Sequence, residues 1–432
     1  DLLDTGLAGR ARTVSVPARR VGQVIRDGEV VDRAAVDDGG DDIESELLLR
    51  ADIATFRLIS RPGQPSSARL VCNAQAPGGT PHEVDTRGAL ARVLAGADAA
   101  GYEYHVGVEI EFFLFPAAAA GPSRRGDDRA ARLDLDPGAA RQVEADIVTG
   151  LEALGVEIES GHHELQSRQH HISLPMQPAM AAADAIATLK PAVKEIAARR
   201  NLAASFMPKP RNNAPSSAMH VQQVLFGVAP GAEDLRPVSR AGGSAPTNAF
   251  HGAGPDGLSP QARWFIAGQL HHAAALCAVV APLVNSYKRL LSPGEEMVSG
   301  WGRQARSVVL RVVAGPDGQD TRLELRLPDA SSNPYLAFAS MLAAGLDGIR
   351  EELEPEPAID SPATRTGQDL TYRRPLPATL GEALVFIRHD AVLEKAVGAE
   401  LLTHFTRAKD IEWAEYSRQV TQWELDSYLH SY

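Results

Sequence analysis

The feature that most constrains the fold is the stretch of residues 106–115, which alternates acidic and apolar residues and then becomes wholly apolar. Side chains alternate between the two faces of a strand, so Glu109 and Glu111 would share one face while Val108 and Ile110 pack on the other. Neighbouring carboxylates repel each other and lose solvation on burial, and such pairs usually persist because a cation lies between them. The pattern is equally compatible with an edge strand that carries two surface acids.

Length and composition restrict the class of protein. The chain has 432 residues, and a prior of roughly 150 residues per domain predicts two or three domains. The apolar fraction of 44% and the charged fraction of 23% are typical of a soluble globular protein. The formal net charge is −12 and no basic tract is present, which argues against nucleic acid or an anionic membrane as a partner.

Cysteine usage and hydropathy favour a cytoplasmic location. Cys72 and Cys277 are far apart and lack metal-type spacing, so we expect buried free thiols in a reducing compartment. No apolar run reaches the roughly 18–20 residues that a membrane span needs. No basic region followed by an apolar region marks a secretory signal at the first residues.

Candidate ligands are concentrated in residues 156–174. Val156 to Glu159 predicts a second alternating strand with two acids on one face. Two histidine pairs, His162-His163 and His170-His171, then flank Glu164. One such pair could be a surface accident, but two pairs around an acid favour metal or phosphate chemistry. His220, which we expect at a loop-to-strand junction, is by itself more typical of a structural histidine.

Arginines dominate a later region. Residues 285–296 predict a polar loop, and the following strand carries Arg303, Arg306 and Arg311. Arginine suits carboxylate and phosphate clamps, although a salt-bridged surface ribbon gives the same pattern. The segment from Arg322 to Asp329 alternates strictly, so Arg322, Glu324 and Arg326 would form the charged wall of a sheet.

The remaining elements are ordinary. We expect short strands at 69–73 and 221–226, a loop at 117–138, and helices at 86–94, 139–154, 178–201, 261–284, 333–349 and 379–430. The chain contains no internal repeat, no Walker-type loop and no G-x-G-x-x-G motif.

The order of five motifs resembles that of the glutamine synthetase superfamily, which includes ligases that join glutamate to larger amines. The resemblance covers residues 50–430. The motifs are Val108 to Phe113, His162-His163-Glu164, Met219-His220, Asn285 to Leu290 with Pro293-Gly294, and Arg322 to Arg326 continuing to Asn333-Pro334-Tyr335.

The resemblance implies an α+β fold with two domains. A small β-grasp-like domain would span residues 1–90, and a catalytic domain would span 91–432. Its curved antiparallel sheet would form a half-barrel funnel backed by helices. The implied reaction uses ATP and two or more Mg²⁺ or Mn²⁺ ions to join an acid and an amine through an acyl phosphate. The implied assembly is a homo-oligomer, a dodecamer of two hexameric rings.

The resemblance also implies residue roles. The metal ligands would be Glu109, Glu111, Glu164, His171, His220 and Glu324. The ATP-binding residues would be Glu159, Gln222, Arg306, Arg311 and Arg322. The substrate-binding residues would be Arg289, Arg326 and Ser216, and the catalytic residues would be Glu296 as the closing acid, Arg306 and Arg326.

Three parts of the site depart from the family pattern. His171 stands where the family has a glutamate ligand, which removes a negative charge and favours softer metals. In residues 216–224, both glycines of the family's Gly-Ser-Gly loop, its second histidine and a serine are replaced, and Pro215 replaces an asparagine. The catalytic aspartate that a neighbouring subunit supplies has only Asp37 and Asp38 as candidates.

Three functions are therefore open. The first is an ATP-dependent carboxylate–amine ligase that uses an amine other than ammonia and, as an option, an acid other than glutamate. The second is a weak or inactive paralogue with a regulatory or assembly role. The third is a metal hydrolase, which would leave the arginine-rich strands unexplained.

Overall fold

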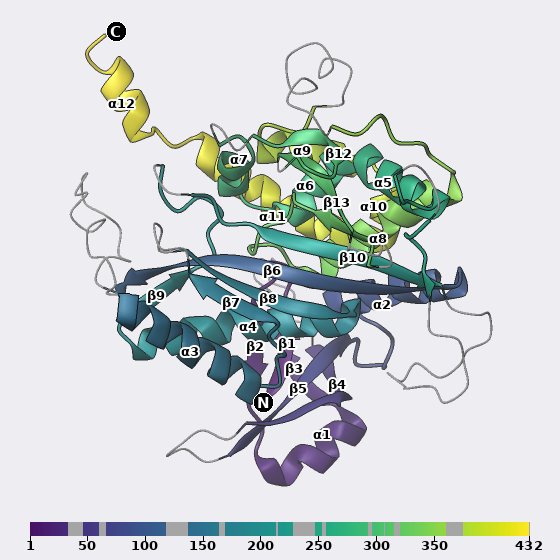
Figure 1. The fold of residues 1–432 in the computed structure, drawn as a ribbon. Coiled ribbons are helices and arrows are strands. Elements are labelled where there is room, and N and C mark those ends of the chain that lie inside the picture. Colours follow the sequence, from purple (N-terminus) through teal and green to yellow (C-terminus); the bar gives the residue numbers. More distant parts are fainter. Residues whose placement is uncertain are drawn as a thin grey trace.

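The computed structural model describes residues 1–32, 46–59, 66–117, 137–163, 169–212, 215–227, 247–252, 256–292, 296–305, 307–314, 320–359 and 375–431. The fold is a mixed α+β structure with two sheets, as predicted, and the larger sheet is a curled half-barrel backed by helices (Figure 1). Within the described ranges, no helix combines the length and apolar character that crossing a membrane requires.

The N-terminal sheet is mixed and small. In the described residues its strand order is β2 (Ala11–Val14), β1 (Leu2–Thr5), β5 (Ser67–Gln75), β4 (Glu46–Ile59) and β3 (Glu29–Asp32). The central pair β1 and β5 is parallel, and the other pairs are antiparallel. Helix α1 (Val21–Asp27) follows the 3₁₀ turn η1 (Ala18–Arg20) and buries Val24 against Leu49, Leu70 and Cys72. This is the expected β-grasp-like arrangement.

The large sheet carries the candidate site. Its main path in the described residues is β12 (Val298–Gly302), β13 (Val308–Val313), β14 (Arg322–Leu325), β10 (Met219–Gly227), β6 (Tyr102–Pro116), β8 (Gln169–Pro178) and β7 (Ser160–His163). Strand β9 (Leu202–Ser205) pairs with β6, and β11 (Thr247–Asn248) pairs with β10. Only β12 and β13 run parallel among these described pairs. Figure 1 shows β6 running through the middle of the sheet between β8 and β10.

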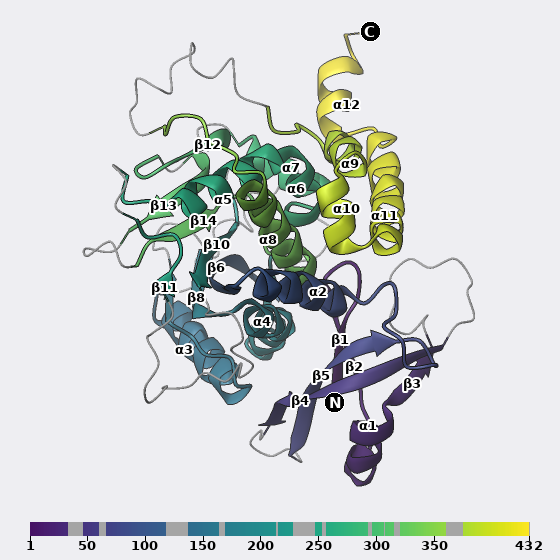
Figure 2. The ribbon, with the colours of Figure 1, turned by 90° about the vertical axis from the view of Figure 1, so that its right-hand side faces the viewer.

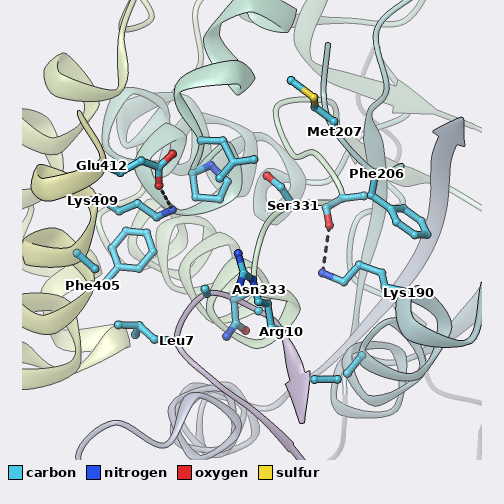
Figure 3. A pocket seen from close by; sticks show the side chains of 18 of the residues that line it. Leu7, Arg10, Lys190, Phe206, Met207, Ser331, Asn333, Phe405, Lys409 and Glu412 are labelled. Carbon is cyan, nitrogen blue, oxygen red and sulfur yellow. Dashed lines mark hydrogen bonds and ion pairs between the residues drawn. The ribbon is translucent and has the colours of Figure 1, made fainter. Parts of the chain in front are cut away.

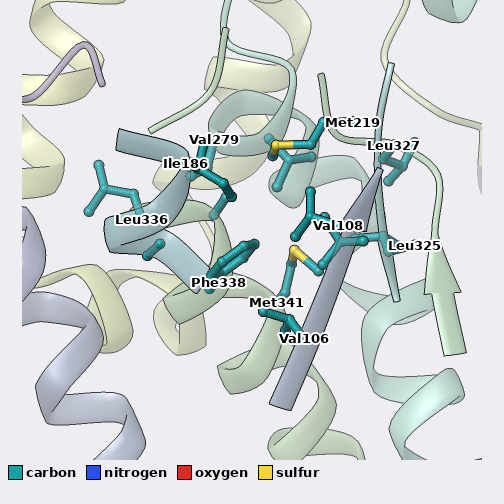
Figure 4. Close-up of a cluster of buried hydrophobic side chains, with 14 of the residues drawn as sticks. Val106, Val108, Ile186, Met219, Val279, Leu325, Leu327, Leu336, Phe338 and Met341 are labelled. Atoms are coloured by element: carbon teal, nitrogen blue, oxygen red, sulfur yellow. The ribbon is translucent and has the colours of Figure 1, made fainter. Parts of the chain in front are cut away.

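Alternation along β6 determines which side of this sheet is packed. Its even-numbered residues from Val106 to Leu114 are apolar and buried. They pack against helices α2 (Thr86–Ala99), α4 (Ala179–Arg199) and α8 (Pro334–Arg350). Figure 4 shows Val106 and Val108 in one cluster with side chains of α4 and α8, among them Ile186, Phe338 and Met341. The odd-numbered face, with Glu109 and Glu111, is therefore left for polar chemistry.

The other helices extend this packing. The apolar pair α5 (Pro260–His271) and α6 (Ala273–Val280) lies near α8, and α3 (Pro137–Ala153) packs beside α4 and β7. Figure 2 shows α2, α4 and α8 beside the sheet, with the C-terminal helices beyond them. These are α9 (Leu380–Arg388), α10 (Ala391–Val397), α11 (Ala399–Ser417) and α12 (Gln422–Tyr428).

Three expected elements are different in the structure. Residues 261–284 are two helices rather than one, because the helix breaks at His272, whose ring is held by Asp347 and Asp390. Val156–Glu159 is not a strand: Gly155 has a φ of +76° and the Val156 amide still bonds to the Leu151 carbonyl, which is a helix C-terminal motif.

The third difference is at residues 285–290, where a loop was expected. They belong to helix α7 (Val284–Leu290), which begins with a hydrogen bond between the Leu283 amide and the Ser286 hydroxyl (3.2 Å). Tyr287 and Leu290 are buried on one side of this turn. The polar residues between Tyr287 and Leu290 made this helical spacing of apolar residues hard to recognise in the sequence.

The domain division at residue 90 stays a prediction. That residue lies inside helix α2, which packs on β6 and α8 of the large unit. The last strand of the small sheet ends at Gln75.

Candidate active site

Strand register brings acidic and imidazole side chains to one face of the large sheet. Glu109 on β6 is directly opposite His220 on β10, and Glu111 is opposite His171 on β8. On the far side of β10, the register places Glu324 of β14 opposite the residue two positions after His220, and therefore on the same face. Five side chains from four strands thus converge without any special loop.

The distances confirm that these side chains form one cluster. His171 Nδ1 lies 3.1 Å from Glu109 Oε1 and 3.8 Å from Glu111 Oε1. His220 lies between Glu111 and Glu324: its Nε2 is 3.6 Å from Glu111 Oε1 and its Nδ1 is 3.9 Å from Glu324 Oε1. The cluster is therefore continuous from Glu109 to Glu324. Glu164, the remaining predicted ligand, lies outside the described residues.

Both central carboxylates are held in the charged form. A hydrogen bond with His171 lowers the pKa of Glu109. Burial acts to raise the pKa of Glu111, but the interaction with His220 and the backbone amide of Ala218 outweigh it and bring the pKa to about 2. The site is therefore negative at neutral pH, which suits a divalent cation.

Two groups that the sequence did not single out fix Glu111. The Ala218 amide donates to Glu111 Oε2 at 2.7 Å, and Gln169 Nε2 donates to the same oxygen at 2.8 Å. Gln169 also donates to the Ser216 carbonyl at 2.8 Å. The predicted substrate residue Ser216 is thus one hydrogen-bonded side chain away from Glu111, with its hydroxyl 3.4 Å from Lys209 Nζ.

His162 is a further candidate ligand: it belongs to the first histidine pair noted in the sequence, but it was not among the predicted metal ligands. Its ring stacks on His171 with centroids 4.4 Å apart, and Glu109, His162 and His171 each offer a ligand atom within 4.8 Å of the others. The signal for His162 was the hairpin register, which places it opposite His171. Two imidazoles and a carboxylate fit a divalent ion, and Glu111, His220 and Glu324 offer a second, more acidic set.

The predicted arginines flank the acidic cluster. Arg326 Nη1 donates to Glu324 Oε1 at 2.5 Å, and Arg311 Nη1 donates to Glu324 Oε2 at 3.4 Å. Arg322 Nη1 donates to Gln222 Oε1 at 2.8 Å. These side chains lie on the predicted charged face, so cationic groups stand next to the candidate cation site, where they can contact phosphate oxygens.

Arg289 lies deeper than the other arginines. It is buried, and its guanidinium donates to the carbonyl of Arg326 at 3.3 Å and to that of Leu327. Burial lowers its pKa, while Asp329 and Glu111 oppose that change. In this arrangement Arg289 supports the end of β14, and its predicted role in holding a substrate carboxylate stays a prediction.

The other predicted residues are at the rim or outside the described chain. Glu159 is exposed immediately before β7, and its amide donates to the Ser173 carbonyl at 2.8 Å. Glu296 is exposed just before β12. Arg306, Asp37 and Asp38 are not among the described residues.

Fold and site together define a class of protein. Carboxylates and imidazoles that gather on a curled antiparallel sheet suit divalent cations, and the arginines beside them suit phosphate groups. This combination suits an enzyme that uses divalent cations to act on a phosphate-bearing substrate.

Comparisons with known proteins define the family. The model described as "Glutamine synthetase, catalytic domain" matches residues 83–428. A glutamine synthetase of Thermus thermophilus is 40% identical to this chain, and the match covers 99% of this chain and 95% of the relative. That of Methanosarcina mazei is 35% identical, with 98% of this chain and 93% of the relative covered.

Solved structures agree. One described as "Apo GmaS without ligand" has a TM-score of 0.81 at 32% identity, and one described as "GmaS/ADP complex-Conformation 1" has 0.83 at 31%. In both, 99% of this chain and 96% of the other are covered. The chain belongs to the glutamine synthetase family, whose members are ATP-dependent ligases that use divalent metal ions.

Proposed function

We propose that this protein is an ATP-dependent carboxylate–amine ligase that forms an amide through an acyl phosphate, with an amine other than ammonia. A substrate acid other than glutamate is a further option. The observation that carries the proposal is the continuous cluster from Glu109 to Glu324, with Arg311 and Arg326 bonded to Glu324. A structural scaffold would gain nothing from carboxylates kept charged at a cost in solvation.

Each part of the cluster has a role in this reaction. The cluster carboxylates and imidazoles would hold two divalent ions, which when bound neutralise phosphates and polarise the γ-phosphoryl group. Arg322, Arg311 and Gln222 would orient the phosphates, and Arg326 would neutralise charge on the phosphoryl group in transfer. Glu296, at the rim, would take the proton from the attacking amine. Arg306, Glu159 and Glu164 complete the proposed set.

The substrate side of the site supports a change of substrate. The loop at Ser216-Ser217-Ala218 stands where the family has glycines, and its backbone is tied to Glu111 through Ala218 and Gln169. Side chains at these positions occupy space that glycine leaves open, so they change the shape beside the acyl group. Solved GmaS structures that cover the whole fold are consistent with a family member specialised away from the curated glutamine synthetases.

The test is release of ADP and phosphate by the purified chain with Mn²⁺ or Mg²⁺ and a panel of acids paired with ammonia or larger amines. We expect turnover that requires both an acid and an amine, with a larger amine preferred over ammonia. Turnover with ammonia alone would contradict the specialised amine. No turnover by a folded protein would contradict the ligase.

A weak or inactive paralogue is the second candidate, and His171 in place of a glutamate favours it. Calorimetry separates the two candidates without a substrate panel. The proposed ligase binds Mn²⁺ and ATP, whereas an inactive assembly subunit binds neither at micromolar concentration.

A further inference from the structure

A cavity of about 790 Å³ lies on the helical side of the large sheet, away from the candidate active site. Its walls come from α4, from the segment that follows β9, from the turn between β1 and β2, and from α11. Figure 3 shows Lys190 of α4 on one side and Lys409 and Glu412 of α11 on the other. None of the predicted catalytic or metal-binding residues that the structure describes lines it.

The charged side chains that line this cavity are mostly basic. They are Arg10, Lys190, Lys194, His404, Arg407, Lys409 and Glu412. Among the described residues that line the cavity, Glu412 is the single acid, and Lys409 already pairs with it at 2.8 Å. The cavity therefore has a positive potential, which attracts anions.

Lys190 is half-buried on the α4 side of the cavity. Its Nζ donates to the carbonyls of Ala330 and Ser332, both at 3.1 Å, and it forms no ion pair with a carboxylate in the part of the chain that the structure describes. An ammonium has three donors, so one stays available to a ligand. Burial, with Lys194 nearby, lowers the pKa of Lys190 to about 8, against the opposing effect of Asp329. A buried ammonium of this kind is stabilised when an anion binds beside it.

The remaining lining is mostly apolar and includes Leu7, Phe206, Leu283 and Phe405, with Ser205, Ser331 and Asn333 as its polar members. The volume is within the range of roughly 300–1,000 Å³ that small-molecule sites have. We propose that this cavity binds a small organic anion with carboxylate or phosphate groups. Lys190, Lys194 and Arg10 would contact the acidic groups, and Phe206 and Phe405 would pack on its carbon skeleton. This site is additional to the proposed catalytic function.

The chain segment that follows β14 connects the candidate active site to the cavity, because Ala330, Ser331 and Asn333 of this segment line the cavity. Lys190 holds the carbonyls of Ala330 and Ser332, and Arg289 holds those of Arg326 and Leu327. Burial lowers the pKa of both cations, and the fully buried Asp329 opposes this change in each of them. An anion that draws Lys190 toward it would therefore weaken the Lys190 hydrogen bonds to Ala330 and Ser332. These two residues belong to the segment that directly follows Glu324 and Arg326 in the chain.

The test is calorimetric titration of the full chain, without ATP or metal, with citrate as the carboxylate probe and pyrophosphate as the phosphate probe. We expect at least one to bind, and the stronger one identifies the acidic group. Binding should weaken at least about tenfold in Lys190→Met and in Arg10→Ala. Arg199→Ala is the matched control, because Arg199 is an exposed cation of α4 outside the cavity, paired with Glu195.

Two further measurements keep the result unambiguous. At pH 8 the wild type should take up protons on binding, because the anion favours charged Lys190, and Lys190→Met should lose this uptake in buffers of different ionisation enthalpy. Arg322→Ala, a variant of the catalytic face, should bind the probe normally. Failure of both probes to bind, equal binding by Lys190→Met and Arg10→Ala, or loss of binding in Arg322→Ala instead, would overturn the proposal. None of these outcomes depends on turnover, so the proposed ligase activity is tested separately.

Discussion

At the scale of single residues, Glu111 connects structure to the proposed chemistry. It is 8% exposed, yet it stays ionised because His220, Gln169 and the Ala218 amide all interact with its carboxylate. A buried carboxylate that is held in its charged form in this way is suited to bind a cation.

The first prediction follows from Glu111. Glu111→Gln keeps the size and removes the charge, so we expect the affinity for Mn²⁺ to fall at least about tenfold by calorimetry. Glu103→Gln is the control, since Glu103 is on the same face of β6 but pairs with His105 at 2.6 Å, away from the cluster. Equal affinities for the two variants would rule out Glu111 as a ligand.

A second residue-scale prediction concerns His272 at the break between α5 and α6. Burial acts against its protonation, but hydrogen bonds to Asp390 (2.6 Å) and Asp347 (3.1 Å) raise its pKa above 6.5. The protonated ring therefore stabilises the folded state fully below about pH 6.5, and this contribution is lost as the pH rises through the raised pKa.

We expect His272→Gln to lower the free energy of unfolding by about 2–4 kcal/mol at pH 6, with a smaller difference from the wild type at pH 9. Denaturant titration at the two pH values measures this. His389→Gln, which changes an exposed histidine whose ring contacts the Val385 carbonyl, is the matched control. A difference that grows with pH would contradict the assignment.

The sequence predicted which residues form the candidate site better than it predicted which of them are in contact. The alternation in β6 and β14 indicated Glu109, Glu111 and Glu324, and the family resemblance added His171 and His220. The sequence showed His162 only as part of a histidine pair, and it did not predict that His162 stacks on His171 or that the Ala218 amide binds Glu111. Both contacts depend on which residues face each other across strands, and spacing along one strand does not show this.

At the scale of elements, long periodic segments were predictable and their interruptions were not. Strand β6 and helices α4 and α8 follow their apolar periodicity. The break at His272 depends on two aspartates distant in sequence, and the end of α3 extends into Val156 through a backbone hydrogen bond. Neither has a local pattern, which is why both were misassigned.

The contact between α5 and α8 gives an element-scale prediction. These helices approach closely at Gly268 and Gly348, where a Cβ on Gly348 would lie 2.1 Å from the Trp264 carbonyl oxygen. We expect Gly348→Ala to lower the free energy of unfolding by at least about 2 kcal/mol. Gly96→Ala in α2 should instead raise it by about 0.5–1 kcal/mol, because no atom lies within 4 Å of the new Cβ. Thermal or denaturant unfolding of the two variants measures whether each change in the free energy of unfolding has the expected sign. Destabilisation by both substitutions would contradict the prediction for Gly96→Ala.

At the scale of the whole molecule, the surface indicates assembly. Helix α12 and its approach expose Val420, Trp423, Tyr428 and Leu429, and strand β4 exposes Ile53 and Leu58. Apolar groups of this size in contiguous segments are typical of interfaces. Glutamine synthetase homologues are generally oligomeric, and the two-ring dodecamer proposed for this chain would cover such surfaces. The cytoplasmic location stays a prediction.

Light scattering of the 46.1 kDa chain tests this assembly. We expect a mass many times that of one chain, and a smaller mass after deletion of residues 419–432, because the apolar side chains of α12 are lost. A full-length protein that stays monomeric at micromolar concentration would contradict the proposed oligomer.

The central claim is that one face of the large sheet holds divalent cations against a nucleoside triphosphate. A crystal structure with Mn²⁺ and a non-hydrolysable ATP analogue, with the metal located by its anomalous signal, tests it most directly. We expect two Mn²⁺ ions within about 2.0–2.6 Å of oxygens or nitrogens of Glu109, Glu111, His171, His220 and Glu324, with the phosphates between them and Arg322. Mn²⁺ sites elsewhere, or a nucleotide bound away from this face, would contradict it.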